Sequence, residues 1–160
     1  MARKSPTTPA VRVLRDAGID YTEHLFDHKR YPGAEMAAEA LGVDPHQTAK
    51  TIVFTTDEGG GAVVVMNGDT EVSTKKLARL LDVKTVHPAT QREARRLTGY
   101  QFGGTSPLGM RSDPPVFVHE TLAEMNRIYV NGGSRGFLVG IEPATLIELC
   151  AARVDDVAAD

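Results

Sequence analysis

The segment 103–109 contains more glycine than one ordinary turn needs. It reads Gly-Gly-Thr-Ser-Pro-Leu-Gly. Glycine lets the backbone approach a ligand closely, and successive free N–H groups in such a loop can bind an anion or a developing oxyanion. The alternative is a structural turn between two strands. The spacing matches neither a Walker loop nor a dinucleotide-binding fingerprint, so neither kind of nucleotide site is expected.

Two further segments carry polar groups suited to a ligand. Lys50 begins an otherwise apolar stretch, Ala-Lys-Thr-Ile-Val-Phe, where it can hold a phosphate as a point charge, act as a base when desolvated, or simply extend into solvent. Residues 131–136 read Asn-Gly-Gly-Ser-Arg-Gly, which is typical of a hairpin turn. Within it, Asn131 and Arg135 are the candidate ligand contacts.

Other reactive residue types do not form a recognised pattern. His24 and His28 are four residues apart but flank a predicted strand end, and with one cysteine and no HExxH sequence we expect no zinc site. Ser106 is not in a GxSxG sequence, so we do not expect it to be a nucleophile. Cys150 lies on a predicted amphipathic helix and is interpreted as a core residue. Neither a metal nor another cofactor is expected.

The composition excludes several classes of protein. A length of 160 residues fits one domain, which we expect to span 1–160 with the first few residues disordered. The net charge of −3 argues against binding nucleic acid through bulk charge, although 75–79 and 92–96 contain local basic groups. No stretch is apolar enough to cross a membrane, and the N-terminus does not read as a secretory signal. With its single cysteine, the chain is expected to be cytoplasmic.

The predicted elements alternate irregularly along the chain. Helices are expected at 9–17, 34–41, 73–81, 88–98 and 143–151, several of them with a capping residue before or a glycine after. Strands are expected at 19–26, 50–56, 62–66, 83–87, 116–119, 128–130 and 137–141. The strands at 50–56 and 62–66 form an antiparallel hairpin that is apolar on both faces. Such hairpins favour an α+β fold with a mixed sheet over simple βαβ winding.

Four segments occur in an order that resembles one known family. They are Thr-Pro-Ala-Val-Arg-Val-Leu at 8–14, Lys-Thr-Ile at 50–52, Thr-Gly-Tyr at 98–100 followed by the glycine loop, and Ile-Tyr-Val-Asn-Gly-Gly-Ser-Arg-Gly at 128–136. In this order they resemble the YbaK/EbsC family of bacterial Cys-tRNA(Pro) deacylases, which is similar to the editing domain of bacterial prolyl-tRNA synthetases. The resemblance covers about residues 6–155. It implies a mixed, partly barrel-like β-sheet flanked by helices.

The resemblance also implies roles for individual residues. Lys50 matches a pocket lysine that holds the phosphate backbone at the terminal adenosine, and Gly103 and Pro107 match the ends of a loop that positions the aminoacyl carbonyl. Asn131 lies where cysteine-specific members carry serine. Lys50, Gly103 and Asn131 are therefore the candidate catalytic groups. The candidate substrate-binding residues are Phe26, Tyr31, Gly104, Thr105, Ser106, Pro107, Gly132 and Arg135.

The activity implied is removal of cysteine from mischarged Cys-tRNA(Pro), and also from Cys-tRNA(Cys). The resemblance implies that the thiol of the attached cysteine attacks the ester that joins this cysteine to the tRNA, so no protein nucleophile is needed. The implied partners are the acceptor end of mischarged tRNA and prolyl-tRNA synthetase, and the chain is expected to be a monomer or a weak homodimer. Two alternatives remain open: an Ala-tRNA(Pro) deacylase in which the loop orients a water, and a non-catalytic module that binds tRNA or the synthetase.

Overall fold

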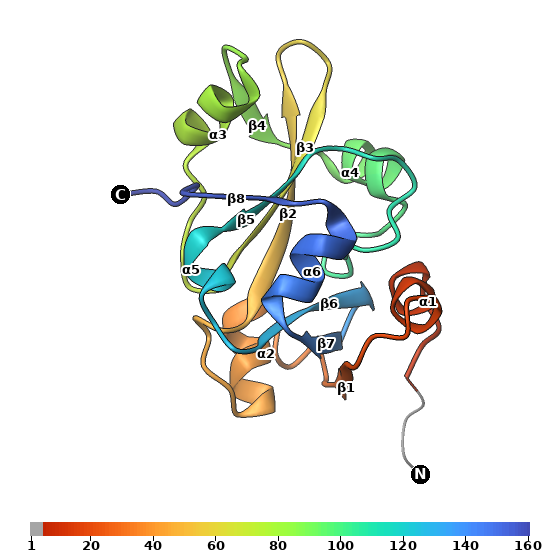
Figure 1. The fold of residues 1–160 in the computed structure, drawn as a ribbon. Helices are drawn as coiled ribbons and strands as arrows, with labels where there is room; N and C mark the ends of the chain where they lie inside the picture. The colour runs from red at the N-terminus through yellow and green to blue at the C-terminus, as the bar shows by residue number, and fades with distance from the viewer. Residues whose placement is uncertain (1–4) are drawn as a thin grey trace.

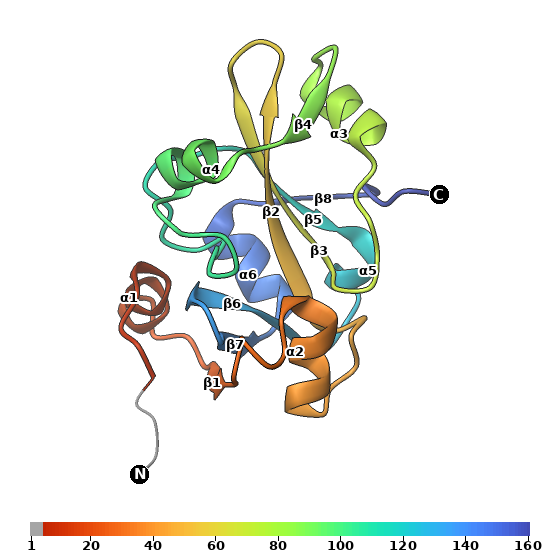
Figure 2. The same cartoon turned by 180° about the vertical axis from the view of Figure 1, so that it is seen from behind.

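The computed structural model describes residues 5–160 and contains two β-sheets and six helices within that range (Figures 1 and 2). The helices are α1 (Pro9–Asp16), α2 (Gly33–Leu41), α3 (Thr74–Leu81), α4 (Gln91–Thr98), α5 (Glu120–Ala123) and α6 (Pro143–Cys150). The strands are β1 (Thr22–Leu25), β2 (Ala49–Thr56), β3 (Gly61–Asn67), β4 (Val86–Pro88), β5 (Val116–His119), β6 (Ile128–Ser134), β7 (Phe137–Ile141) and β8 (Arg153–Asp155). The prediction that the first few residues are disordered concerns residues 1–4, outside the described range.

The larger sheet is mixed and has the strand order β4-β2-β3-β5-β8. Its centre is the predicted β2–β3 hairpin, in which Lys50 pairs with Met66 and Val53 with Val63. Alternate residues of this hairpin enter two separate apolar clusters, with Val53 in one and Phe54 in the other. Because both faces are covered, the hairpin is apolar along most of its length, as expected for a strand buried on both sides.

The smaller sheet is antiparallel, in the order β1-β7-β6. It meets the larger sheet at the start of β2, where Thr48 forms an isolated parallel bridge with Tyr129 and the Tyr129 N–H donates to the Gln47 carbonyl at 3.1 Å. The predicted α+β class is confirmed. In place of a partly barrel-like sheet, the described strands form two sheets joined at this corner and do not close a barrel.

Capping side chains fix where several helices begin. The Thr8 hydroxyl accepts from the Val11 N–H at 3.1 Å at the start of α1, and the Ser73 hydroxyl accepts from the Lys76 N–H at 3.2 Å before α3. At α4, Thr90 and Glu93 form a reciprocal capping box. The predicted start of this helix at Pro88 is wrong, because Pro88 is the last residue of β4.

Other predictions also differ from the structure. The strand predicted at 83–87 is β4, which spans only Val86–Pro88. The first strand is shorter than 19–26, since β1 spans only Thr22–Leu25. Strand β6 continues through the segment interpreted as a hairpin loop, with an irregularity between Asn131 and Ser134. Helix α5 and strand β8 were not predicted, because elements of four and three residues are too short to show a periodic pattern.

Candidate active site

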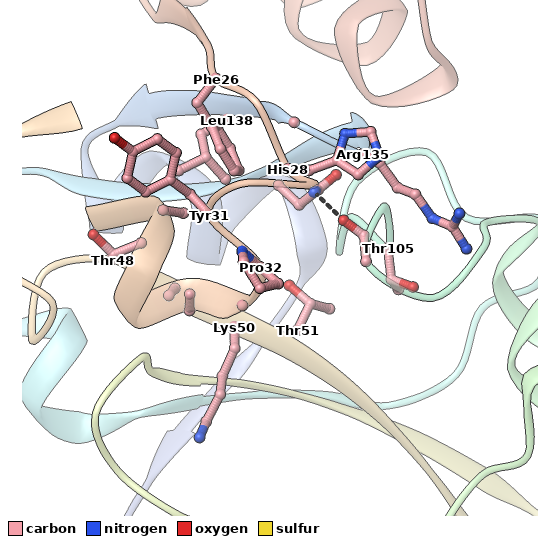
Figure 3. Close-up of a pocket in the computed structure, with 17 residues that line it drawn as sticks. Phe26, His28, Tyr31, Pro32, Thr48, Lys50, Thr51, Thr105, Arg135 and Leu138 are labelled. Carbon is pink, nitrogen blue, oxygen red and sulfur yellow. Dashed lines mark hydrogen bonds between the residues drawn. The ribbon is translucent and has the colours of Figure 1, made fainter. Parts of the chain in front are cut away.

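A cavity of about 390 Å³ lies where the two sheets meet (Figure 3). Its wall is built by the loop after β1, the first turns of α2, the start of β2, the β6–β7 hairpin and the glycine loop. The volume is at the small end of the range for pockets that hold small molecules. A cavity of this size holds a small molecule or the end of a larger one.

Seven of the predicted site residues line this cavity, although their positions span more than a hundred residues of sequence. They are Phe26, Tyr31, Lys50, Gly103, Thr105, Asn131 and Arg135. The other four predicted residues, Gly104, Ser106, Pro107 and Gly132, do not line it. The roles assigned to all eleven residues stay predictions.

The aromatic side of the wall is shaped by a tight turn after β1. The Phe26 N–H donates to the Gly136 carbonyl at 3.0 Å, which ties the end of β1 to the β6–β7 turn. Asp27 accepts from the Lys29 N–H at 3.1 Å, and the Tyr31 N–H donates to the Asp27 carbonyl at 2.9 Å. This aspartate-initiated turn brings Tyr31 back to the cavity beside Phe26.

Lys50 contributes to the wall, but its ammonium group points away from the other labelled residues in Figure 3. It forms an ion pair with Glu71, with Nζ 3.4 Å from Oε1. Glu71 has 83% of its side chain exposed, so this pair contributes little stability and is easily exchanged for another anion. The backbone of Lys50 thus belongs to the wall, while its ammonium group is directed away from the cavity.

The next residue, Thr51, was missed by the sequence reasoning. Thr51 lines the cavity, and its buried hydroxyl oxygen has no hydrogen-bond partner within residues 5–160. A buried hydroxyl without a partner is costly and rare, so this oxygen is a candidate contact for a bound molecule or a water. His28 also lines the cavity without having been predicted to do so. The sequence offered no signal for Thr51, because a threonine in a strand is ordinary.

Phe102 and the first three residues of the glycine loop, 103–105, are hereafter called the outer half of the loop. This segment is fixed beside the cavity by side chains of the β6–β7 hairpin. Asn131 donates from Nδ2 to the Gly103 carbonyl at 2.9 Å, the dashed line in Figure 3, and Arg135 donates from Nε to the Phe102 carbonyl at 2.9 Å. The Asn131 oxygen also accepts from the N–H groups of Gly133 and Ser134. Asn131 thus holds the loop and the β6 irregularity together.

The outer half leaves backbone donors available. Within residues 5–160, the N–H groups of Gly103 and Thr105 donate to no other group, whereas the Gly104 N–H donates to the Gln101 carbonyl at 2.9 Å. The φ of Gly103 is +81°, a conformation that favours glycine. Helix α2 adds further donors, because its cap residue Pro32 supplies no side-chain acceptor and its first turn lines the cavity.

The segment 106–109, hereafter the inner half of the loop, is packed into the protein. Ser106 is fully buried, and its hydroxyl accepts from the Leu108 N–H at 3.2 Å. The Tyr100 hydroxyl donates to the Leu108 carbonyl at 2.6 Å, and the Cys150 thiol donates to the Pro107 carbonyl at 3.3 Å. These contacts hold Ser106 and Pro107 in the protein interior, away from the cavity.

The remaining predicted residues are also structural in their surroundings. A Cβ at Gly132 would lie 2.4 Å from the Phe137 ring, and the Gly132 carbonyl accepts from the Thr8 hydroxyl. Gly132 therefore allows β6 to pack closely against β7 and α1. Gly104 lines a neighbouring hollow instead of the cavity.

The buried thiol is unsuited to nucleophilic attack. Burial raises the pKa of Cys150 to about 12, so the thiolate that would be the nucleophile is scarcely present at neutral pH. Cys150 also does not line the cavity.

Within residues 5–160, no group of three or more His, Cys, Asp or Glu side chains is placed to hold a metal ion. Each helix in the same range is too short or too polar to cross a bilayer.

Comparison with known proteins identifies this arrangement. A family model described as "aminoacyl-tRNA editing domain" matches residues 28–149, which include all the cavity-lining residues except Phe26. The chain belongs to this family. The resemblance to the YbaK/EbsC editing domains stated from the sequence is thereby confirmed.

Individual relatives of this editing domain agree with the match. The chain is 32% identical over 98% of its length to EbsC of Enterococcus faecalis, a protein proposed to be a Cys-tRNA(Pro)/Cys-tRNA(Cys) deacylase, of which it covers 98%. It is 30% identical over 88% of its length to the proline–tRNA ligase of Desulforamulus reducens, but covers only 24% of that enzyme. A crystal structure of a proposed trans-editing enzyme for prolyl-tRNA synthetase superposes with a TM-score of 0.84 at 27% identity, covering 98% of this chain and 100% of that one.

Proposed function

We propose that this editing domain is a deacylase that removes cysteine from Cys-tRNA(Pro). The observation that carries the proposal is the outer half of the loop, whose backbone is fixed against a cavity of about 390 Å³ by Asn131 and Arg135. A fixed backbone with free N–H groups can orient an aminoacyl ester and stabilise the negative charge that develops on its carbonyl oxygen.

In this mechanism the nucleophile belongs to the substrate. The cysteine sulfur attacks the carbonyl carbon of its own ester and forms a C–S bond. The bond from that carbon to the ribose oxygen breaks, and the thiol proton is transferred to the ribose oxygen. The products are tRNA with a free terminal hydroxyl and a four-membered thiolactone. The protein contributes orientation, while its own thiol, Cys150, is buried with a pKa of about 12.

The relatives support the choice of tRNA and of amino acid. The Enterococcus faecalis relative is named for Cys-tRNA(Pro) and Cys-tRNA(Cys), and the ligase relatives handle proline. A site built for proline cannot strongly exclude side chains of similar or smaller size, because small differences in apolar contact contribute only about 1–3 kcal/mol. A separate editing site that acts in trans corrects this error. We therefore propose mischarged tRNA and prolyl-tRNA synthetase as partners, in the cytoplasm.

One observation favours a second candidate, hydrolysis of Ala-tRNA(Pro). Alanine has no thiol, so its removal needs an oriented water. The unpartnered Thr51 hydroxyl in the cavity wall is a group that can hold such a water.

The test is to measure release of labelled amino acid from Cys-tRNA(Pro), Ala-tRNA(Pro), Ser-tRNA(Pro) and Pro-tRNA(Pro) in parallel. We expect rapid loss of cysteine only, because serine has the shape of cysteine but an oxygen that is a much weaker nucleophile at neutral pH. Loss of alanine at a comparable rate would favour hydrolysis, and loss of no ester would contradict both proposals. The variant Cys150→Ser should retain activity, since the reacting thiol is the substrate's.

A further inference from the structure

An exposed aromatic residue, Phe102, directly precedes Gly103 of the cavity wall. Phe102 is 44% exposed, and the other large exposed apolar side chains in residues 5–160 are Met36 on α2 and Val154 on β8. A single exposed apolar residue is ordinary. Phe102 differs because the backbone at it and directly after it is held, by Arg135 at its own carbonyl and by Asn131 at the carbonyl of Gly103.

The residues on either side of Phe102 in the sequence line two different hollows. The next residue, Gly103, lines the cavity, while Gln101 and Gly104 line a second hollow of about 360 Å³. Arg135 lines both hollows and donates to the Phe102 carbonyl, so it lies along the ridge that separates them. Anything that extends from the cavity into the second hollow passes Arg135 and the backbone of Phe102, which Arg135 contacts.

The Arg135 guanidinium is available to such a ligand. Its Nε is bound to the Phe102 carbonyl, but within residues 5–160 its two terminal nitrogens have neither a hydrogen-bond partner nor a carboxylate. Planar guanidinium groups bind phosphates well. The other candidate cation, Lys50, has its ammonium group paired with Glu71 instead. Arg135 is therefore the cation at the ridge.

We infer that Phe102 and Arg135 form a platform for the nucleotide that precedes the terminal adenosine of tRNA. The base stacks on the Phe102 ring, and the phosphate that joins it to the terminal adenosine binds the free nitrogens of Arg135. This inference rests on the proposed function, since the preceding nucleotide reaches the ridge only when the aminoacyl ester is held in the cavity. Stacking on an aromatic side chain with a nearby arginine is a common way to bind single-stranded RNA.

The stacking part is tested with an uncharged acceptor-stem minihelix that carries a fluorophore at its 5′ end. Binding is measured by fluorescence anisotropy, which requires no deacylation. Base–aromatic stacking implies that Phe102→Ala weakens binding by about 5-fold to 150-fold, whereas Phe102→Tyr retains it. Val154→Ala is the matched control, because Val154 is 40% exposed on β8, and its affinity should equal that of the wild type.

The phosphate part is tested by the salt dependence of the same affinity. One lost phosphate contact in single-stranded RNA lowers the slope of log affinity against log salt by about 0.7. We expect this decrease for Arg135→Gln, retention of the slope for Arg135→Lys, and no change for Arg79→Gln, an exposed arginine on α3. Phe102→Ala should weaken binding without changing the slope.

A second RNA, with an abasic site in place of the penultimate base, decides the assignment. The wild type should bind the abasic RNA as weakly as the Phe102→Ala variant binds the intact RNA. The variant should bind the abasic RNA and the intact RNA with equal affinity. An equal loss from Phe102→Ala on both RNAs, or no loss on either, would overturn the platform. Deacylation of Cys-tRNA(Pro) is measured alongside. A wild type that binds through Phe102 but releases no amino acid defeats the proposed function alone, and one that deacylates but is insensitive to Phe102 defeats the platform alone.

Discussion

The two halves of the glycine loop are adjacent in the sequence but have different surroundings. The outer half, 102–105, is held beside the cavity by Asn131 and Arg135, which act on its backbone carbonyls from the β6–β7 hairpin. The inner half, 106–109, is held in the core by Tyr100 and Cys150, which also act on backbone carbonyls. One short segment thus joins a ligand-facing surface to the hydrophobic core.

This difference teaches that the glycines of one loop need not share one purpose. Gly103 has a positive φ where only the Arg135 side chain is near, so its conformation serves the shape of the cavity rim. Gly109 also has a positive φ, but it touches the backbone of α1. We therefore expect substitutions in the inner half to reduce stability and substitutions in the outer half to reduce activity.

The largest effect is expected from Gly109→Ala. The new Cβ would lie 2.6 Å from the Pro9 carbonyl carbon, which is backbone and cannot move cheaply, and the φ of +66° is itself unfavourable for alanine. Overpacking and backbone strain together should lower the free energy of unfolding by about 3 kcal/mol, as measured by urea denaturation. Gly18→Ala is the matched control, because Gly18 has the same φ of +66° in open space, and it should lose only about 1 kcal/mol.

Gly103→Ala should separate activity from stability. Its Cβ would meet the Arg135 side chain at 3.5 Å, an ordinary contact, so stability should fall by only about 1 kcal/mol for the φ of +81°. Displacement of the free N–H groups should lower kcat/KM for Cys-tRNA(Pro) by about 100-fold. Gly59→Ala, at φ +84° in the β2–β3 turn, should lose similar stability and no activity. An active Gly103→Ala enzyme would remove the outer half from the mechanism.

Asn131→Ala should have an intermediate effect. It releases the Gly103 carbonyl and the two N–H groups that Asn131 holds, so the outer half becomes less well fixed. We expect kcat/KM to fall by about 10-fold to 30-fold and stability by about 1–2 kcal/mol. Steady-state kinetics and thermal unfolding of the same preparation measure both. If stability falls while kcat/KM is unchanged, Arg135 alone is sufficient to position the loop.

The smallest effect concerns pH and the inner half. Burial raises the pKa of both Tyr100 and Cys150 to about 12. Since each folded-state pKa lies above its unfolded value, each group contributes stability that is complete below about pH 9 and is lost as pH rises toward 12. Each group changes the free energy of unfolding by at most about 1.4 kcal/mol per pH unit. Urea denaturation between pH 8 and 11 should show this decline, and Tyr100→Phe should make it shallower; an identical slope would contradict the burial argument.

Much of the fold could be predicted because its signals are local. Capping residues such as Thr8 and Ser73, and the apolar β2–β3 hairpin, depend on neighbours in sequence. The α5 and β8 elements could not be predicted, because they are short and are stabilised by contacts with distant strands. Strand β6 was predicted too short because its irregularity depends on the Asn131 side chain, which bonds to the backbone only once the chain turns.

Only part of the cavity wall was predicted from the sequence, and the reason is physical. The sequence could not indicate which face of β2 meets the cavity, because residues on both faces are apolar and both are buried. The prediction therefore chose Lys50, whose ammonium group is directed away from the cavity, and passed over Thr51. Nor could the sequence divide the glycine loop, since burial of Ser106 and Pro107 depends on Tyr100 and on Cys150 from α6.

The corner between the two sheets has a consequence for how such a domain acquires new selectivity. Ala49 and Thr51 line the cavity from one sheet, and Asn131 and Leu138 line it from the other, so the width of the opening depends on the angle between the sheets at the joint near Tyr129. That angle depends on the packing behind the joint. Substitutions in the interior can therefore change the size of the side chain that the cavity accepts, while every residue of the cavity wall stays the same. Related proteins with identical cavity linings can then differ in the amino acid that they remove.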